Sequence, residues 1–348
     1  RDGASRETLL QYLKDIYEHD SSLRPDLIFC TGDIAFGETG ASPLTQQYEQ
    51  AKTFFDSLLV VCGRGNSPLS KERLFVIPGN HDVNRRNINS DAQATLTNWA
   101  VRSREKADVI NQRFEERTKE FCDTIERLDE YGKFVQDYLP HQLDEDGRHR
   151  YVRIVDVDGL KVGVAGFNSA WTCAGPEDDR TLWLAAKWQF NIASQQLKDA
   201  KISIGLMHHP IDWLNEAERE IARERIAGKF QFWLHGHSHD AWVTPAQSHI
   251  TIGAGAVGAE VSEEFGVNLV SLDLAEAKGI AHLHAYTPRG DGWVIKPIPK
   301  HAPTGKWPFS LPVGLREDGS FSLDPKIEKT EKIELKTPPN LETPPDPE

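Results

Sequence analysis

The feature that most limits the fold of this chain is the succession, within its first 80 residues, of two short apolar runs separated by a helical pattern. The apolar runs are residues 27–30 and 74–77, and each is bounded by glycine or proline, as is typical of a buried strand. Between them, apolar residues recur at helical spacing from Tyr48 to Cys62. A strand, a helix and a strand with short connections predict a parallel crossover unit, and therefore an α/β protein.

The rest of the chain is richer in strands. A hairpin is expected at residues 151–157 and 161–167, because Asp158-Gly159 is a strong two-residue turn signal. Helices are expected at residues 7–17 and 216–227, and further strands at 202–207, 232–234, 250–252, 267–272, 280–285 and 293–295. Residues 86–145 read as a helical insertion or cap, for which a solvated helical hairpin is the simpler interpretation.

Length and charge set further limits. A chain of 348 residues allows one large domain or two. A net charge of −13 argues against non-specific nucleic-acid binding without excluding it. The four cysteines are widely spaced, which favours reduced thiols and a cytoplasmic location. No apolar run approaches the roughly 18 residues of a membrane span.

The end of the chain differs in composition. Residues 326–348 contain no aromatic residue, and the final twelve residues contain five prolines. We therefore expect one domain over residues 1–300 and a Pro-rich, charged linker or tail over residues 301–348. Such a tail is consistent with fusion to a further C-terminal domain.

Metal-ligand side chains are concentrated in four short segments, each directly after a predicted strand. They are Gly32-Asp33, Gly79-Asn80-His81-Asp82, His208-His209-Pro210 and His235-Gly236-His237-Ser238-His239. The carboxyl ends of parallel strands meet at one sheet edge, so these side chains are expected to lie together. Their oxygen and nitrogen donors suit Mn, Zn or Fe, and the sequence therefore predicts a metal site.

The order of these motifs resembles the calcineurin-like metallophosphoesterases over roughly residues 1–295. The resemblance implies a four-layer sandwich of two stacked mixed β-sheets flanked by helices. It also implies two divalent metal ions, with Mn favoured over Zn or Fe, and a metal-bound hydroxide that hydrolyses phosphoesters.

Carried over by position, the resemblance assigns a role to each motif residue. Asp33 would bridge both metals. Asn80, His208 and His237 would complete the second metal site, and His239 would serve the first. His81 would act as general acid or stabilise the transition-state charge, and Asp82, placed with it in the catalytic set, would support the orientation of that loop. His209 and His235 either orient the ligands or simply pack, and both interpretations stay open.

Two departures from the family pattern matter. The family begins with an Asp-x-His strand that supplies two ligands to the first metal, and no such segment precedes Asp33. We expect it to lie before Arg1, whereas a true loss would leave a one-metal or inactive site. The Ser/Thr protein phosphatases follow Gly-Asp with x-x-Asp-Arg-Gly, but here Ile34-Ala35-Phe36-Gly37 follows, which argues against that branch.

The expected function is hydrolysis of phosphodiesters in a nucleotide or nucleic acid, which makes a nuclease one option. Arg85-Arg86, just beyond the Gly-Asn-His-Asp loop, are candidates to hold an additional phosphate, although solvated surface arginines are the simpler interpretation. The alternative function is a catalytically weak or inactive, metal-stabilised sensing or interaction domain of a larger protein.

Overall fold

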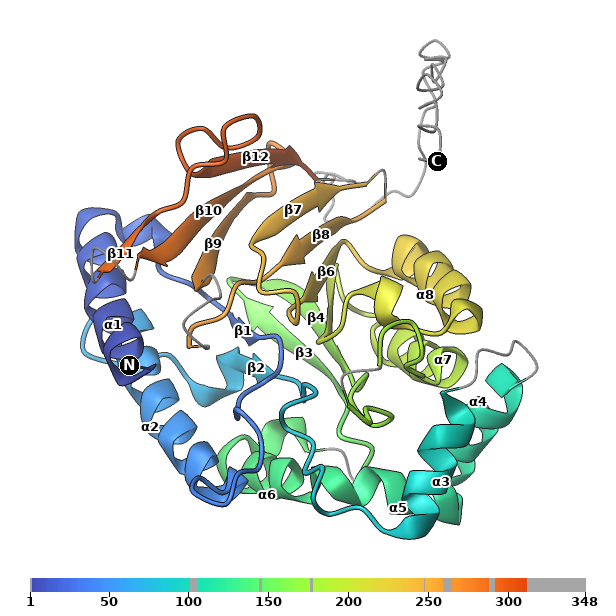
Figure 1. Ribbon diagram of the computed structural model, residues 1–348. Coiled ribbons are helices and arrows are strands. Elements are labelled where there is room, and N and C mark those ends of the chain that lie inside the picture. The colour runs from blue at the N-terminus through green and yellow to red at the C-terminus, as the bar shows by residue number, and fades with distance from the viewer. Residues whose placement is uncertain are drawn as a thin grey trace, which may run out of the picture.

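The largest sheet of the protein has six strands and is mixed. The computed structural model describes residues 2–100, 106–143, 146–175, 178–246, 248–258, 265–287 and 292–311. In spatial order, the strands are β3 (Tyr151–Val157), β4 (Leu160–Phe167), β5 (Ile202–Met207), β6 (Phe232–His235), β8 (Ile250–Gly253) and β7 (Trp242–Pro245) (Figure 1). The four inner strands are parallel to one another, and β3 and β7 close the two ends in the antiparallel sense.

Two further sheets accompany it. An antiparallel sheet contains β9 (Gly266–Asp273), β10 (Lys278–Thr287), β11 (Gly292–Ile295) and β12 (Lys306–Ser310), with β10 paired to the other three. A parallel pair is formed by β1 (Ile28–Cys30) and β2 (Leu74–Val76). One apolar core takes side chains from all three sheets, including Phe75, Leu206 and Leu283, so the sheets are held together by burial of apolar surface.

Helices flank these sheets. The connections of the inner strands are α7 (Ala186–Gln196) between β4 and β5, and α8 (Glu216–Lys229) between β5 and β6. Figure 1 shows α7 and α8 together at one flank and α1 (Asp2–His19) with α2 (Leu44–Cys62) at the opposite flank. None of the helices in the described ranges combines the length and apolarity that a membrane span requires.

The helical segment after β2 is part of the core, which corrects the expected solvated hairpin. It contains α3 (Ser90–Trp99), α4 (Lys106–Glu116), α5 (Lys119–Ile125) and α6 (Asp129–Tyr138). Phe114 and Phe121 pack against Trp171, with ring centroids 5.1 and 5.7 Å away. Arg127, only 1% exposed, donates to the carbonyls of Trp171 and Cys173. These contacts join the segment to the loop that follows β4.

Three elements escaped the sequence pattern. The expected helices and all of the expected strands are present, but α7, β7 and β12 were not predicted. β12 contains Pro308 and pairs only with β10 among the described strands, and proline is tolerated on such an edge strand. β12 lies beyond residue 300, at which the expected domain ends, and is paired with β10. Residues 312–348, which hold most of the expected tail, lie outside the described residues.

A buried carboxylate on α8 makes the stability of this fold depend on pH. Glu218 accepts hydrogen bonds from Asn111 Nδ2 (3.0 Å), Leu184 N (3.0 Å) and Ala186 N (2.8 Å). Burial raises its pKa from 4.5 to about 7. The folded state therefore holds this proton more tightly than the unfolded state. The free energy of unfolding is expected to fall by about 3 kcal/mol as the pH rises from 4.5 through 7.

The measurement is the free energy of chemical unfolding of wild type and Glu218→Gln between pH 5 and pH 8. The variant has no carboxyl group to ionise at this position, so its stability should fall less steeply. Glu224→Gln, which changes an exposed glutamate of the same helix, should keep the wild-type dependence. Parallel curves for wild type and Glu218→Gln would contradict the prediction.

Candidate metal centre

Four donor atoms from the predicted segments meet at the carboxyl ends of the parallel strands. Asp33 follows β1, Asn80 follows β2, His208 follows β5 and His237 follows β6. His208 Nε2 lies 2.9 Å from Asn80 Oδ1 and 3.2 Å from Asp33 Oδ2. His237 Nδ1 lies 2.9 Å from the same Asn80 oxygen and 3.3 Å from His208 Nε2. We call these four residues the donor cluster.

Two glycines make this convergence possible. A Cβ atom at Gly79 would lie 2.1 Å from Asp33 Oδ1, and one at Gly32 would lie 2.4 Å from His208 Nδ1. Gly32 also has a φ of +100°, a conformation that other residues rarely adopt. The glycines of these two motifs are therefore required by the close approach of the ligand side chains.

Hydrogen bonds set the orientation of the donor cluster. His208 Nδ1 lies 2.7 Å from the Thr31 carbonyl, so Nδ1 carries a hydrogen and Nε2 is the nitrogen that faces the cluster. Asp33 Oδ1 accepts from the His81 backbone N–H at 2.9 Å. The His81 ring donates from Nδ1 to the Phe36 carbonyl at 2.7 Å, which leaves His81 Nε2 as the available nitrogen.

The neighbours of Asp33 and His237 set the protonation states of these two side chains. Burial raises the pKa of Asp33, but the neighbouring His208 and His81 outweigh it and bring the pKa to about 2. Burial and the nearby His208 lower the pKa of His237 to about 4. At neutral pH the cluster thus offers a carboxylate and a neutral imidazole, the forms in which these side chains bind metal.

Asp82 lies beneath the cluster and does not line the cavity described below. Its side chain is completely buried. It accepts hydrogen bonds from Gly79 N (2.8 Å), Ala35 N (3.0 Å), Ile34 N (3.2 Å) and the Tyr48 hydroxyl (3.0 Å). Burial, with the nearby Asp33, raises its pKa to about 6. From this position the carboxylate holds together the loops that carry Asp33 and Asn80.

The remaining histidines differ in their surroundings. The ring nitrogens of His208, His209 and His237 lie within 4.8 Å of one another. However, His209 Nδ1 is 2.8 Å from Ser169 Oγ, and its Nε2 is 3.7 Å from Cys173 Sγ. Because both its nitrogens have protein partners, we place His209 in support of the cluster and not within it.

The other two histidines lie on the strand β6 and the loop that follows. His235 Nδ1 is 3.2 Å from the carbonyl of Gly236 in the same loop. His239 has a φ of +52° and lies near enough to His237 to lower its pKa. The structure therefore keeps His239 near His237 and gives His235 a local backbone partner.

The chemistry of the donor cluster fits a divalent metal ion. Four contacts of 2.9–3.3 Å link the two oxygens and two nitrogens, and the two imidazole nitrogens approach both the same oxygen and each other. A cation between such donors satisfies all four at once, and a mixed O and N set suits Mn, Zn or Fe. The residues present thus fit a site with four ligands.

A cavity of about 220 Å³ opens beside the cluster. It is lined by Asn80, His81, Arg85, Gly175, Asp178, His209, Trp213 and His237. The Trp213 ring packs edge-to-face on His237, with centroids 4.1 Å apart. Phe36, Tyr48, Ser169 and Trp213 received no role from the sequence. The only signals for them were that Phe36 follows the Gly32-Asp33 motif, that Tyr48 lies in the predicted helix, that Ser169 follows a predicted strand, and that Trp213 follows His-His-Pro closely.

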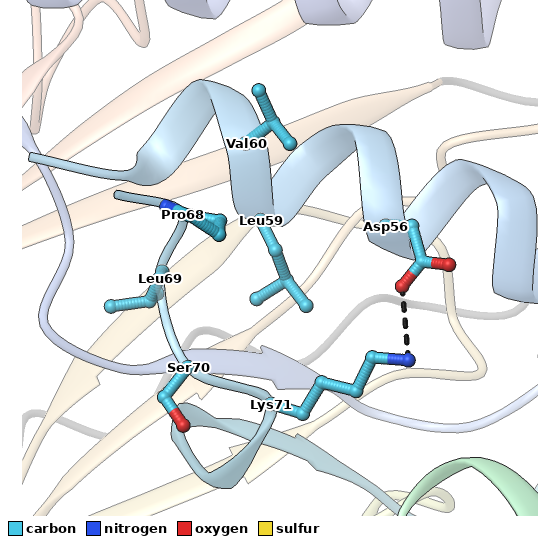
Figure 2. A pocket seen from close by; sticks show the side chains of 7 residues that line it. All are labelled: Asp56, Leu59, Val60, Pro68, Leu69, Ser70 and Lys71. Atoms are coloured by element: carbon cyan, nitrogen blue, oxygen red, sulfur yellow. Dashed lines mark ion pairs between the residues drawn. The ribbon is translucent and has the colours of Figure 1, made fainter. Parts of the chain in front are cut away.

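A second hollow, of about 290 Å³, is of another kind. Figure 2 shows it between the end of α2 and residues 68–71, with Asp56 and Lys71 paired at 3.1 Å. Leu59, Val60, Pro68 and Leu69 make its lining mainly apolar. It contains none of the predicted site residues, so the chemistry is assigned to the cavity beside the donor cluster.

Comparison with known proteins adds independent information. A family model described as calcineurin-like phosphoesterase matches residues 3–241, more than half of the chain. The metallophosphoesterase-like protein YydB of Bacillus subtilis is 21% identical over 243 residues, which are 68% of this chain and 45% of YydB. The chain thus spans about half the length of that curated relative.

Solved structures with similar chains are more distant. GAP50 of Plasmodium is 10% identical, with 81% of this chain and 80% of that chain covered and a TM-score of 0.42. The sulfate thiohydrolase SoxB of Thermus thermophilus is 20% identical, with 35% and 22% covered and a TM-score of 0.26. The range matched by the family model contains the whole donor cluster, His81 and His239.

Proposed function

The chain belongs to the calcineurin-like phosphoesterase family, and from that premise we propose that it hydrolyses phosphodiester bonds of a nucleotide or nucleic acid in a metal-dependent reaction. The observation that carries the proposal is the donor cluster, in which four contacts of 2.9–3.3 Å join the ligand atoms beside a polar cavity. The expected four-layer sandwich is supported by the apolar core shared between the sheets.

The donor cluster would hold one divalent ion, and Asp33 with His239 would contribute to a second. Such ions supply positive charge that activates water and stabilises the phosphoryl oxygens. We favour Mn over Zn or Fe. In the assigned roles, Asp33 is a ligand of both ions. Asp82 fixes the loops that carry Asp33 and Asn80 relative to each other through its four hydrogen bonds.

His81 is assigned the role of general acid. It lines the cavity, and its Nδ1 is fixed on the Phe36 carbonyl. Its Nε2 is therefore the nitrogen that can give a proton to the leaving oxygen of the substrate. Because the His81 backbone N–H also holds Asp33, the acid and the metal ligand keep a constant separation.

The preference for a phosphodiester rests in part on Arg85. This exposed side chain lines the cavity, and its guanidinium forms no hydrogen bond or ion pair within the described ranges. A guanidinium that makes no hydrogen bond is suited to bind phosphate oxygens, and here it shares the cavity with the carboxylate of Asp178. Burial raises the pKa of that carboxyl, and the charge of Arg85 opposes the rise. In a chain of net charge −13, this local positive charge would offset the general repulsion of an anionic substrate.

The test is an activity panel on metal-free protein supplied with Mn, Zn or Fe. The panel contains an aryl phosphodiester, an aryl phosphomonoester, cyclic nucleotides, and single- and double-stranded DNA and RNA. We expect diesters to be hydrolysed faster than the monoester, with activity lost to a chelator and restored by metal. Monoester preference, or no turnover with any metal, would contradict the proposal.

The alternative function is a metal-stabilised sensing or interaction domain. It is favoured by the small number of ligands for a second ion, since only Asp33 and His239 are assigned to that ion and a site with one ion would be less active or inactive. In that case the protein would bind metal and nucleotide without turnover. The activity panel, combined with a metal titration, separates the two functions.

The role of Arg85 gives a further prediction. Arg85→Gln is expected to raise the KM for the best diester of the panel by about 10-fold, because it removes a charged hydrogen-bond donor worth roughly 1.5–3 kcal/mol. The kcat should change less, since the variant keeps the donor cluster and His81. Arg64→Gln, which changes an exposed arginine in a surface ion pair with Asp26 and outside the cavity lining, is the control. Equal KM values for wild type and Arg85→Gln would exclude the phosphate contact.

A further inference from the structure

An exposed aromatic side chain stands next to the proposed general acid. Phe36 lies in the loop after β1 and is 53% exposed. Its ring stacks on the imidazole of His81, with centroids 5.5 Å apart and planes inclined by 27°. Single exposed apolar residues are common on protein surfaces, but this one lies in contact with a residue of the proposed reaction.

The loop holds Phe36 in place by several hydrogen bonds. The Phe36 N–H donates to Gln47 Oε1 at 2.6 Å, and Gln47 Nε2 donates to the carbonyls of Gly37 and Ser42, each at 2.7 Å. The Phe36 carbonyl accepts from His81 Nδ1 at 2.7 Å. Gln47 belongs to α2, so a helix clamps the backbone on both sides of the ring. The aromatic face is therefore preorganised, which lowers the entropic cost of binding a ligand there.

The surroundings of Phe36 combine an aromatic face with positive charge. Arg86 belongs to the same side, since its Nη1 is 3.6 Å from the position of a Cβ at Gly40 in the Phe36 loop. Arg85 lines the cavity on which His81 opens. Aromatic faces beside a positively charged path are the elements with which proteins bind single nucleotides and single strands.

We propose that Phe36 is the stacking platform for a nucleobase on the leaving half of the substrate. The inference rests on the proposed function, in which His81 gives its proton to the leaving oxygen. In that hydrolysis, water adds its hydroxyl to phosphorus, the P–O bond to the leaving nucleoside breaks, and the leaving oxygen gains a proton. The group attached to that oxygen lies beside His81, where the neighbouring aromatic surface is Phe36.

This proposal narrows the substrate class to phosphodiesters whose leaving alcohol is a nucleoside. Stacking tolerates any base, because every base has an aromatic face. We therefore expect little selectivity among the four bases and a clear preference for a base over no base.

The test compares thymidylyl-thymidine with its two analogues in which one nucleoside lacks the base. The products identify the leaving half. The wild type should show a kcat/KM about 10- to 100-fold higher when the leaving half carries a base, as expected for one stacked base. Phe36→Ala should lose this preference, because its kcat/KM on the base-containing substrate should fall to its kcat/KM on the abasic one, and it should keep its thermal stability. Phe36→Trp should restore the preference.

Other outcomes overturn the inference. If Phe36→Ala slows both substrates equally, Phe36 acts only on the position of His81. If Phe36→Ala slows the hydrolysis of neither substrate, the ring does not bind the substrate and has another role, such as contact with a protein. If the wild type hydrolyses no diester, the proposed function fails, and binding to the Mn-loaded protein decides the inference. A loss of at least about 10-fold in affinity that is confined to base-containing dinucleotides would still support stacking, and equal affinities would exclude it.

Discussion

Asp33→Asn is expected to abolish hydrolysis, with a loss in kcat of more than about 10³-fold, beyond that of a single electrostatic contact. Asp33 uses one carboxylate oxygen on His208 and the other on the His81 backbone. With a pKa of about 2, it is ionised throughout the working pH range. The amide is neutral, and its NH₂ group would face either His208 or the His81 N–H. The variant thus removes the only carboxylate of the donor cluster at nearly constant volume.

The measurement is bound metal and turnover on the same sample, with thermal stability to establish folding. Asp26→Asn is the matched control, because Asp26 forms a surface ion pair with Arg64 at 2.7 Å and such pairs contribute little. Full metal content with near-normal turnover in Asp33→Asn would remove Asp33 from the metal site.

His81→Ala is expected to slow hydrolysis by about 10²–10⁴-fold, the usual scale for a general acid, while metal content stays close to that of the wild type. The alanine variant keeps the backbone N–H that holds Asp33, and the His81 side chain is not a member of the donor cluster. The rates are to be compared on diesters with alkyl and nitrophenyl leaving groups.

The leaving group decides between the two roles of His81. A nitrophenolate needs little protonation, so the loss should shrink for that substrate. An equal loss for both leaving groups would point to stabilisation of transition-state charge, and a loss of metal would point to a defect of the Asn80 loop. His239→Ala serves as a comparison, because it alters a predicted ligand and should reduce metal content.

The donor cluster was predictable from sequence because it depends on local rules. Each ligand directly follows a short apolar strand, and the carboxyl ends of parallel strands share one edge. The glycines at positions 32 and 79 precede the ligands Asp33 and Asn80, and their lack of a side chain is what allows the approach. The order of the motifs along the chain therefore predicted that these ligand side chains would lie together.

The supporting contacts were not predictable because their partners are far apart in the chain. His208 and His209 are adjacent, and only the contacts of His209 with Ser169 and Cys173 show which of them lies behind the cluster. The burial of the helical segment could not be predicted from its own sequence either, because Phe114 packs against Trp171, which lies 57 residues later in the chain. Its mixed charge therefore suggested a solvated hairpin.

Arg127 couples the outer helices to the loops of the metal centre. Its backbone carbonyl accepts from Asn84 N at 2.8 Å, just after the Gly-Asn-His-Asp loop. Its buried guanidinium donates to the carbonyl of Cys173, whose sulfur contacts His209. A local opening of these helices would leave the Arg127 donors unsatisfied and release two loops of the site together. The helices and the site loops therefore belong to one cooperative unfolding unit, and a partner that bound and ordered the helices would also lower the population of open states at the site.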